Sequence, residues 1–177
     1  MIAQPVFSIP KLVDEDYGAE LQDELIPKCK KSFTNTDFKI ELKCDVDLSY
    51  RLMPCDFDKH LNLLETIAHN EHTGKFLYLN CEDPDWLDRA KFATEKHSDL
   101  YLGNVLTAIS ALSQYPEIHA TQLLGRKVFL AGINTDASKE VFSISFDNTS
   151  HCFIVKPTFL HEHDAHDYFG LLTLEIC

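Results

Sequence analysis

The amino-acid sequence predicts an α+β fold, a single domain over residues 1–177 with a mostly antiparallel sheet and three to four helices. Two observations favour this class. Over the last third of the chain, short runs rich in β-branched and aromatic residues follow one another with no helix pattern between them. Earlier segments alternate between helix-like and strand-like patterns, and no linker, repeat or low-complexity block divides the chain.

The first elements are predicted from the spacing of apolar residues. Residues 10–27 combine acidic side chains with a partial apolar stripe, which indicates a helix or helix-loop. Apolar and polar side chains alternate over residues 38–50, as in a strand with one solvated face. Asp56 is a suitable N-cap for a helix that ends near Gly74. Residues 75–81 then resemble a buried strand.

Capping residues and prolines predict the elements that follow. Asp83 precedes Pro84, the usual order at the start of a helix, because the first turn does not need the N–H that proline lacks. A second helix is expected to begin at Ser98 or Asp99 and to be stopped by Pro116. The last predicted strands are residues 127–133, 140–146, 152–156 and 170–176, with a hairpin turn over residues 147–150.

Composition and charge exclude several classes of function. The chain has 177 residues, 45% of them hydrophobic, which is enough for a core without disulfides or a structural metal. Sixteen Lys and Arg against 28 Asp and Glu give a net charge of −12, which argues against direct binding of nucleic acid or of anionic membranes. We find no secretory signal, no membrane span and no CxxC pair among six cysteines, so we expect a cytoplasmic protein with free thiols. Its oligomeric state stays open.

The densest group of potential metal ligands is the segment from His161 to Asp167. Three imidazoles, at His161, His163 and His166, alternate with carboxylates, and Zn²⁺ accepts such ligands. The order resembles the HxHxDH signature of metallo-β-lactamases, with the aspartate one place early. One interpretation is therefore a small metal-dependent hydrolase, with zinc as the metal and Glu162 or Asp164 either as base or as a residue that orients the metal ligands. The other interpretation is a solvated polar loop, in which case no cofactor is expected.

Other catalytic patterns are incomplete. His119 and Thr121 match one half of the two-histidine phosphoesterase signature, but no second copy occurs. Asp45 and Asp47 form a DxD pair of the type that holds Mg²⁺, yet the alternation of the strand places both on its solvated face. The chain contains no GxSxG, GxGxxG, HExxH or phosphate-binding GxxxxGK[ST]. We therefore do not expect an enzyme.

The remaining positive signal is clustered acidity beside aromatic residues. Such surfaces can occupy a basic cleft, where charge speeds encounter and aromatic side chains anchor the complex. In this general character the chain resembles bacterial immunity proteins of contact-dependent growth inhibition systems. The resemblance implies binding of a cognate basic toxin domain, a nuclease first of all, by covering its active site or substrate groove. A further alternative is a structural accessory whose acidity only provides solubility. The predicted contact residues are Asp14, Glu15, Asp16, Glu20, Asp23 and Glu24 in a first patch, and Glu82, Asp83, Asp85, Trp86 and Asp88 in a second.

Overall fold

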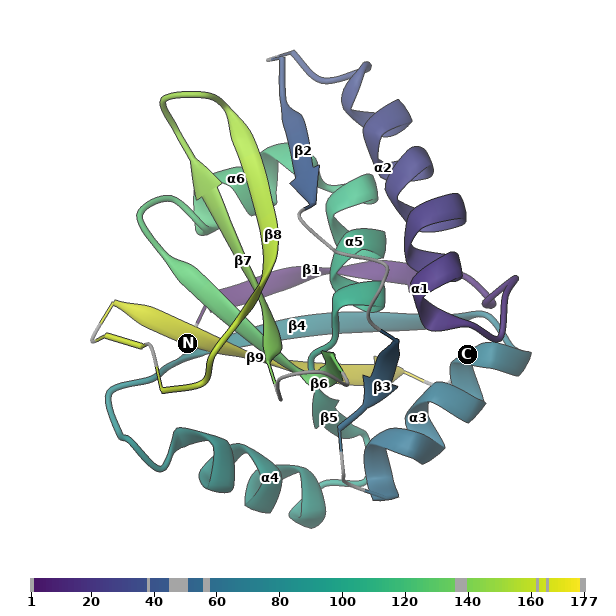
Figure 1. Cartoon of the computed structure of the whole chain (residues 1–177), viewed down its shortest axis with the longest axis vertical. Coiled ribbons are helices and arrows are strands. Elements are labelled where there is room, and N and C mark those ends of the chain that lie inside the picture. The colour runs from purple at the N-terminus through teal and green to yellow at the C-terminus, as the bar shows by residue number, and fades with distance from the viewer. Residues whose placement is uncertain are drawn as a thin grey trace.

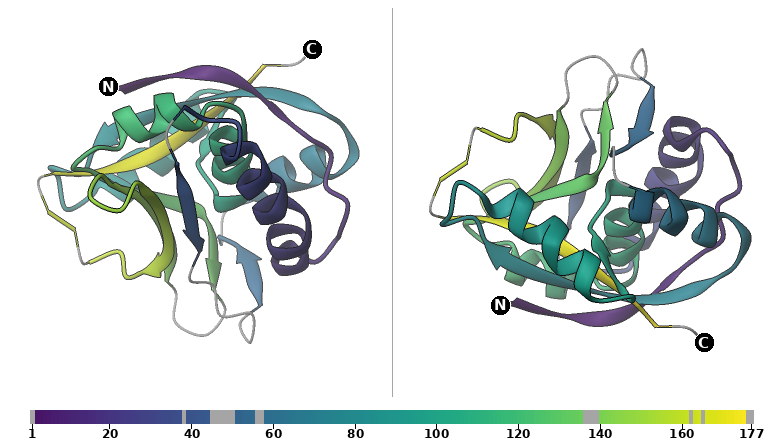
Figure 2. Two further views of the ribbon diagram at one scale, coloured as in Figure 1. Left: turned by 90° about the horizontal axis from the view of Figure 1, so that it is seen from above. Right: turned by 90° about the horizontal axis from the view of Figure 1, so that it is seen from below.

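One bent β-sheet organises the fold, and helix α5 (Val105–Gln114) packs against its inner face (Figures 1 and 2). The computed structural model describes residues 2–37, 39–44, 51–55, 58–135, 140–161, 163–164 and 166–175. In Figure 1 the long strands β1, β4 and β9 run across the view, whereas β2, β7 and β8 stand nearly upright. The strands are β1 (Ile2–Ile9), β2 (Glu41–Cys44), β3 (Leu52–Pro54), β4 (His72–Asn80), β5 (Leu100–Leu102), β6 (Lys127–Thr135), β7 (Val141–Asp147), β8 (Cys152–Thr158) and β9 (Asp167–Glu175).

The described strands form one mixed sheet in the order β1-β4-β9-β6-β7-β8-β2. Strand β3 adds to β6, and β5 adds to β9. Most neighbours are antiparallel, but β2 pairs parallel with β8, and β6 pairs parallel with β9. The last strand of the chain therefore lies in the middle of the sheet, between β4 and β6.

The helices form five stretches within the described residues. The first is continuous: α1 (Tyr17–Ala19) passes into the π-helical segment η1 (Glu20–Leu25) and then into α2 (Ile26–Phe33). Pro27 cannot donate the N–H that an α-helical turn would use, and the wider π-helical turn lies directly before α2. The other helices are α3 (Asp58–His69), α4 (Trp86–Lys96), α5 and α6 (Pro116–Gln122).

The chain is α+β, but the predicted architecture is wrong: most strand pairs are antiparallel, yet the sheet is large and mixed, and there are more than three to four helices. The described residues contain nine strands in a mixed sheet and five helical stretches. Pro116 does end α5, yet it also begins α6, because the first turn of a helix tolerates proline. The helix expected from Ser98 or Asp99 starts later, at the cap Asn104, whose Oδ1 accepts the Thr107 N–H at 3.0 Å. The short strand β5 occupies the residues between.

The sheet has a hydrophobic core on each face. On the inner face, the buried residues of α5, α2 and α3 pack against β1, β4, β6, β7 and β8. Helix α4 covers the other face, where the Trp86 ring stacks on Phe169 and Phe129 with centroid distances of 5.0 and 5.6 Å. The alternation of a strand explains the division, since Phe169 and Leu171 of β9 face α4 while Leu172 and Leu174 face α5. Among the described helices, none is both long and apolar enough to cross a membrane.

Candidate functional site

The first acidic patch begins in the loop between β1 and α1, which we call the acidic loop (residues 13–16). One of the predicted contact residues, Glu20, is buried, with 1% of its surface exposed. Its Oε2 accepts hydrogen bonds from the backbone N–H groups of Val13 and Asp14, both at 2.8 Å. Glu20 as a surface contact is therefore wrong. Its carboxylate instead holds the acidic loop from beneath.

Two further carboxylates fix the acidic loop from within. Asp16 is the N-cap of α1, and its Oδ1 accepts the N–H groups of Gly18 at 2.8 Å and Ala19 at 3.3 Å. Asp14 Oδ1 accepts the Asp16 N–H at 2.8 Å. Asp14, Glu15 and Asp16 all stay exposed to solvent. The loop thus presents three consecutive carboxylates on a backbone that side-chain hydrogen bonds hold in place.

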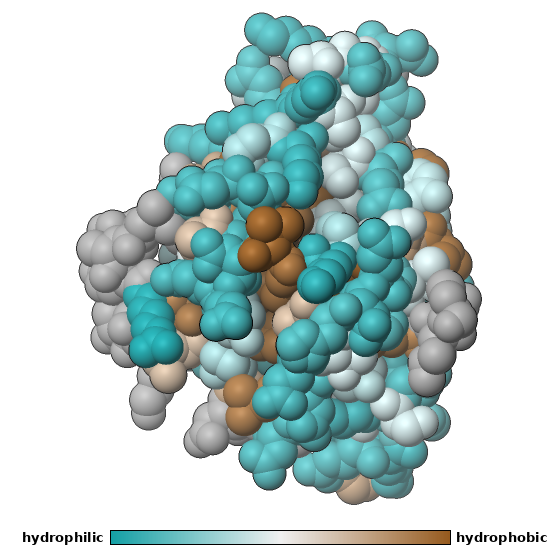
Figure 3. Space-filling view, turned by 90° about the vertical axis from the view of Figure 1, so that its right-hand side faces the viewer, coloured by the Kyte–Doolittle hydropathy of each residue, from teal (hydrophilic) through white to brown (hydrophobic). Residues whose placement is uncertain are grey.

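Val13 is exposed at the start of this loop. Its exposed fraction of 70% is the highest among the large hydrophobic residues that the structure describes as exposed. Figure 3, seen from the side on which α1 and α3 lie, shows a small hydrophobic area surrounded by hydrophilic side chains. An exposed aliphatic side chain on a fixed loop with acidic side chains is a suitable contact for a partner that is basic and partly apolar.

Two hollows flank the acidic loop. One, of about 380 Å³, lies between the loop and α3, and the other, of about 410 Å³, lies between the loop and β3. Glu15 and Tyr17 line both hollows. Burial first, and the charge of Glu65 second, raise the pKa of the Tyr17 hydroxyl. The surroundings of the loop are thus hollowed and rich in carboxylates, with Lys11, Arg51 and His69 as their basic residues.

The rest of the first patch lies along the helix. Asp23 is exposed on η1. Glu24 forms an ion pair with Lys28 one turn later, with 3.0 Å between Oε2 and Nζ. This pair offsets part of the negative charge of Glu24. Asp14, Glu15, Asp16 and Asp23 are thus the predicted residues of this patch that keep an exposed carboxylate outside any ion pair among the described residues.

The second acidic patch surrounds the start of α4. Glu82, Asp85 and Asp88 are exposed. Asp83 is half-exposed and pairs with Arg89 at 2.9 Å. The backbone N–H of Asp85 and then the Arg89 guanidinium lower the pKa of the Asp83 carboxyl. Trp86 is 3% exposed and belongs to the core under α4, so its predicted role as an interface anchor is wrong.

The two acidic patches lie at opposite ends of the long strands. Strand β1 leads into the first patch from Ile9, which pairs with His72 at the start of β4. The second patch follows Asn80 at the other end of β4. Strand β4 rises by roughly 3.3 Å per residue, so the two patches lie apart by most of the length of β4. They form two surfaces: Val13 is exposed on the first, whereas Phe92, the exposed aromatic residue one turn after Asp88 on α4, carries Lys96 Nζ 4.1 Å from its ring centroid.

The histidine segment does not bring three potential ligands together among the residues that can be described. The His161 ring packs on Phe159 with 5.5 Å between centroids, and His163 Nδ1 lies 3.2 Å from the Leu160 carbonyl. The carboxylate of Asp167 is turned inward, 3.0 Å from Lys127 Nζ. No group of three His, Cys, Asp or Glu side chains suited to a metal occurs in the described ranges, which omit Glu162. Metal binding by His161, His163 and His166 stays a prediction.

Two other predicted motifs have simple placements. His119 and Thr121 lie two apart on α6, so they point to different sides of the helix. His119 is fully buried, whereas Thr121 is exposed and its Oγ1 donates to the Glu117 carbonyl at 3.0 Å. The pair cannot act on one substrate as a phosphoesterase motif requires. Asp45 and Asp47 lie outside the described residues.

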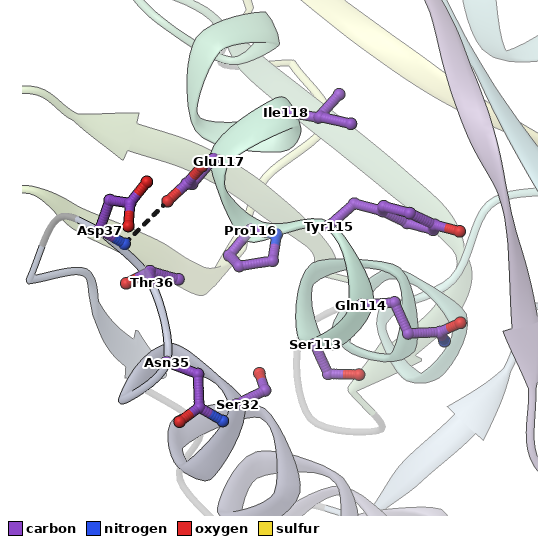
Figure 4. Close-up of a pocket in the computed structure, with 10 residues that line it drawn as sticks. All are labelled: Ser32, Asn35, Thr36, Asp37, Ser113, Gln114, Tyr115, Pro116, Glu117 and Ile118. Atoms are coloured by element: carbon purple, nitrogen blue, oxygen red, sulfur yellow. Dashed lines mark hydrogen bonds between the residues drawn. The ribbon is translucent and has the colours of Figure 1, made fainter.

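Sequence reasoning missed a hollow of about 510 Å³ beside the end of α2 and the corner between α5 and α6 (Figure 4). Hydroxyl and amide side chains line it, together with the carboxylates of Asp37 and Glu117. Glu117 Oε1 accepts the backbone N–H of Asp37 at 3.0 Å, which joins the two walls. The only trace of this hollow in the sequence is a run of turn-forming residues after α2 and the proline between α5 and α6.

Comparison with family models, with curated proteins and with solved structures finds no match to this chain.

Proposed function

We propose that this chain is a cytoplasmic inhibitor of the immunity type, which binds a cationic toxin domain and covers its active site or substrate groove. The toxin we favour is a nuclease, because a nuclease needs basic side chains where it holds phosphates. The observation that carries this proposal is Val13, exposed at 70% on the acidic loop that Glu20 holds in place.

A fixed loop is well suited to binding. Association costs free energy when flexible segments become ordered at the interface, and a loop already held by hydrogen bonds avoids much of this cost. Val13 supplies the apolar contact that a purely charged surface lacks. Asp14, Glu15 and Asp16 would then meet the basic side chains that surround the toxin's substrate groove, in place of the phosphates of its substrate.

The overall charge of −12 would act mainly on the rate of association. Complementary fields raise the association rate at low salt by orders of magnitude, and added salt screens them. The inhibitor itself performs no chemistry under this proposal. Its effect is steric and electrostatic, and it requires a complex that lasts longer than the toxin's own encounter with its substrate.

The test is a growth assay with the protein encoded by the neighbouring reading frame, followed by binding measurements with the purified pair. Coexpression of this chain should rescue growth, and the complex should form in the nanomolar range. Val13→Ser combined with Glu15→Gln should weaken binding at least tenfold and abolish rescue.

The matched control is Glu82→Gln combined with Asp88→Asn, which changes the second patch. This control removes two carboxylates from exposed positions and should leave affinity within about twofold. The proposal is rejected if the neighbouring protein is neither toxic nor bound, or if only the control pair impairs binding.

A further inference from the structure

Two hollows adjoin at helix α6, on a surface other than the acidic loop, and together we call them the α6 groove. The first is the 510 Å³ hollow of Figure 4, whose walls come from the end of α2 and from the corner between α5 and α6. The second has about 340 Å³ and lies between α6, Ile40 and the turn that joins β7 to β8. Glu117 lines both, so the two hollows are neighbours on either side of one side chain.

The first half of the α6 groove is suited to a cation. Figure 4 shows the side chains of Asp37 and Glu117 close together at one end of the hollow. Within the described residues, neither carboxylate forms an ion pair, and no Lys, Arg or His lines this half. Residues at the C-terminal ends of α2 and α5 line this half, and the C-terminal end of a helix carries negative partial charge. Lys30 and Lys31 lie on the last turn of α2 but do not line the hollow.

The second half of the α6 groove is apolar. Four of its eight lining residues are Ile40, Ala120, Leu124 and Phe146, and the others are Glu117, Thr121, Asn148 and His151. Leu124 is 49% exposed, although it directly follows the buried Leu123. A half-exposed leucine beside an apolar hollow loses its contact with water when a second apolar side chain fills that hollow.

We propose that the α6 groove binds a short basic segment of another protein, with an arginine side chain in the polar half and an aliphatic neighbour in the apolar half. Charge complementarity selects this occupant, because an anionic or neutral polar segment would leave the negative charges of Asp37 and Glu117 without a counter-charge. Arginine fits better than lysine, since its planar guanidinium can donate to two carboxylates at once. The proposal does not depend on the acidic loop or on the toxin.

The probe is a short fluorescent peptide in which arginine and leucine alternate, compared with the same peptide carrying citrulline in place of arginine. Citrulline keeps the shape of the side chain and removes its charge. We expect saturable binding of the arginine peptide in the micromolar range and at least tenfold weaker binding of the citrulline peptide. Backbone NMR shifts should concentrate at Asp37, Glu117 and Leu124, with the acidic loop unchanged.

Two variants test the two halves separately. Glu117→Gln keeps an acceptor for the Asp37 N–H but removes the charge, so the protein stays folded while arginine binding weakens at least fivefold. Leu124→Ser should weaken both peptides by a similar factor. Glu82→Gln, which removes one charge at the second acidic patch and does not line the α6 groove, is the control and should have no effect.

Three results would overturn the proposal. These are no saturable binding of the arginine peptide, equal binding of the citrulline peptide, or equal weakening by Glu82→Gln and Glu117→Gln, which would indicate general attraction to an acidic protein. Because Val13→Ser should leave peptide binding unchanged, failure here is distinguishable from failure of the inhibitor proposal.

Discussion

Two buried histidines should make this protein much less stable at pH 5 than at pH 7.5. His60 on α3 is 1% exposed and His119 on α6 is fully buried. Neither ring nitrogen of either residue has a hydrogen-bond partner among the described residues. Burial lowers the pKa of His60 to about 3 and that of His119 to about 4. Both imidazoles are therefore neutral in the folded protein at pH 5 and above.

The sign of the effect follows from which state binds more protons. In the unfolded chain both imidazoles have a pKa of about 6.5, so at pH 5 the unfolded state is protonated and the folded state is not. Stability is complete above the unfolded pKa and falls as the pH drops below it. The loss continues until the pH reaches the folded value of each histidine.

The magnitude at pH 5 is large. This pH lies about 1.5 units below the unfolded pKa, and each unit corresponds to about 1.36 kcal/mol. Each histidine therefore costs about 2 kcal/mol, and the two together cost about 4 kcal/mol. A domain of this size is stable by roughly 5–15 kcal/mol in total. The effect should be visible as a clear shift in the urea midpoint.

The assay is urea denaturation of wild type, His60→Leu, His119→Leu and the double variant at pH 7.5 and pH 5. Each leucine variant should lose about half of the difference between the two pH values, and the double variant should lose nearly all of it. His161→Gln is the control, because that side chain is exposed. The reasoning is refuted if wild type has the same free energy of unfolding at both pH values. It is also refuted if the double variant shows the same difference between the two pH values as wild type.

Three further predictions concern single contacts. Glu20→Ala should destabilise the protein by about 1–3 kcal/mol, because two backbone N–H groups lose their acceptor. The control Glu15→Ala should change the free energy of unfolding by no more than about 0.5 kcal/mol. Thermal denaturation compares the two variants. Trp86→Ala should cost about 3–5 kcal/mol, as for a buried aromatic residue, and a loss below 1 kcal/mol would contradict its place between Phe129 and Phe169. Gln114→Ala should cost about 1 kcal/mol and speed amide exchange at Ser8, because the Gln114 side chain accepts from the Ser8 N–H at 2.9 Å and donates to its carbonyl at 2.7 Å; unchanged exchange would count against this pairing.

Local sequence patterns predicted individual elements well where a pattern is compatible with only one type of secondary structure. The strands β6, β7 and β8 and the turn after Asp147 are confirmed, because short runs of β-branched and aromatic residues around a polar turn have few other interpretations. Pro116 had two meanings, the end of one helix and the start of another, and the sequence favoured only the first. Short β5 is a strand because β9 lies beside it, a partner more than sixty residues away that no local pattern contains.

Sheet order depended on the path of the whole chain. Strands that follow one another without helices suggested hairpins throughout, and β6, β7 and β8 do form them. After β8, however, the chain passes through the histidine segment and returns to insert β9 between β4 and β6. This insertion places β9 parallel to β6, with Lys127 opposite Asp167 in the register, where their side chains form an ion pair. The position of β9 between β4 and β6 is determined by tertiary packing and not by a local sequence pattern.

The acidic residues show why charge alone could not locate a binding surface. Glu20 and Glu24 look equivalent in the sequence, yet the first is buried under the acidic loop and the second pairs with Lys28. Trp86 lies between acidic neighbours, but its partners at helical spacing, Ala90 and Thr94, define a buried face that outweighs them. Each patch has an exposed apolar residue nearby, but Phe92 beside the second patch lies under Lys96, whereas Val13 stands on the acidic loop that Glu20 holds in place. Because exposed carboxylates alone serve solubility as well as binding, the exposed Val13 on a fixed backbone is what argues for a partner at the acidic loop.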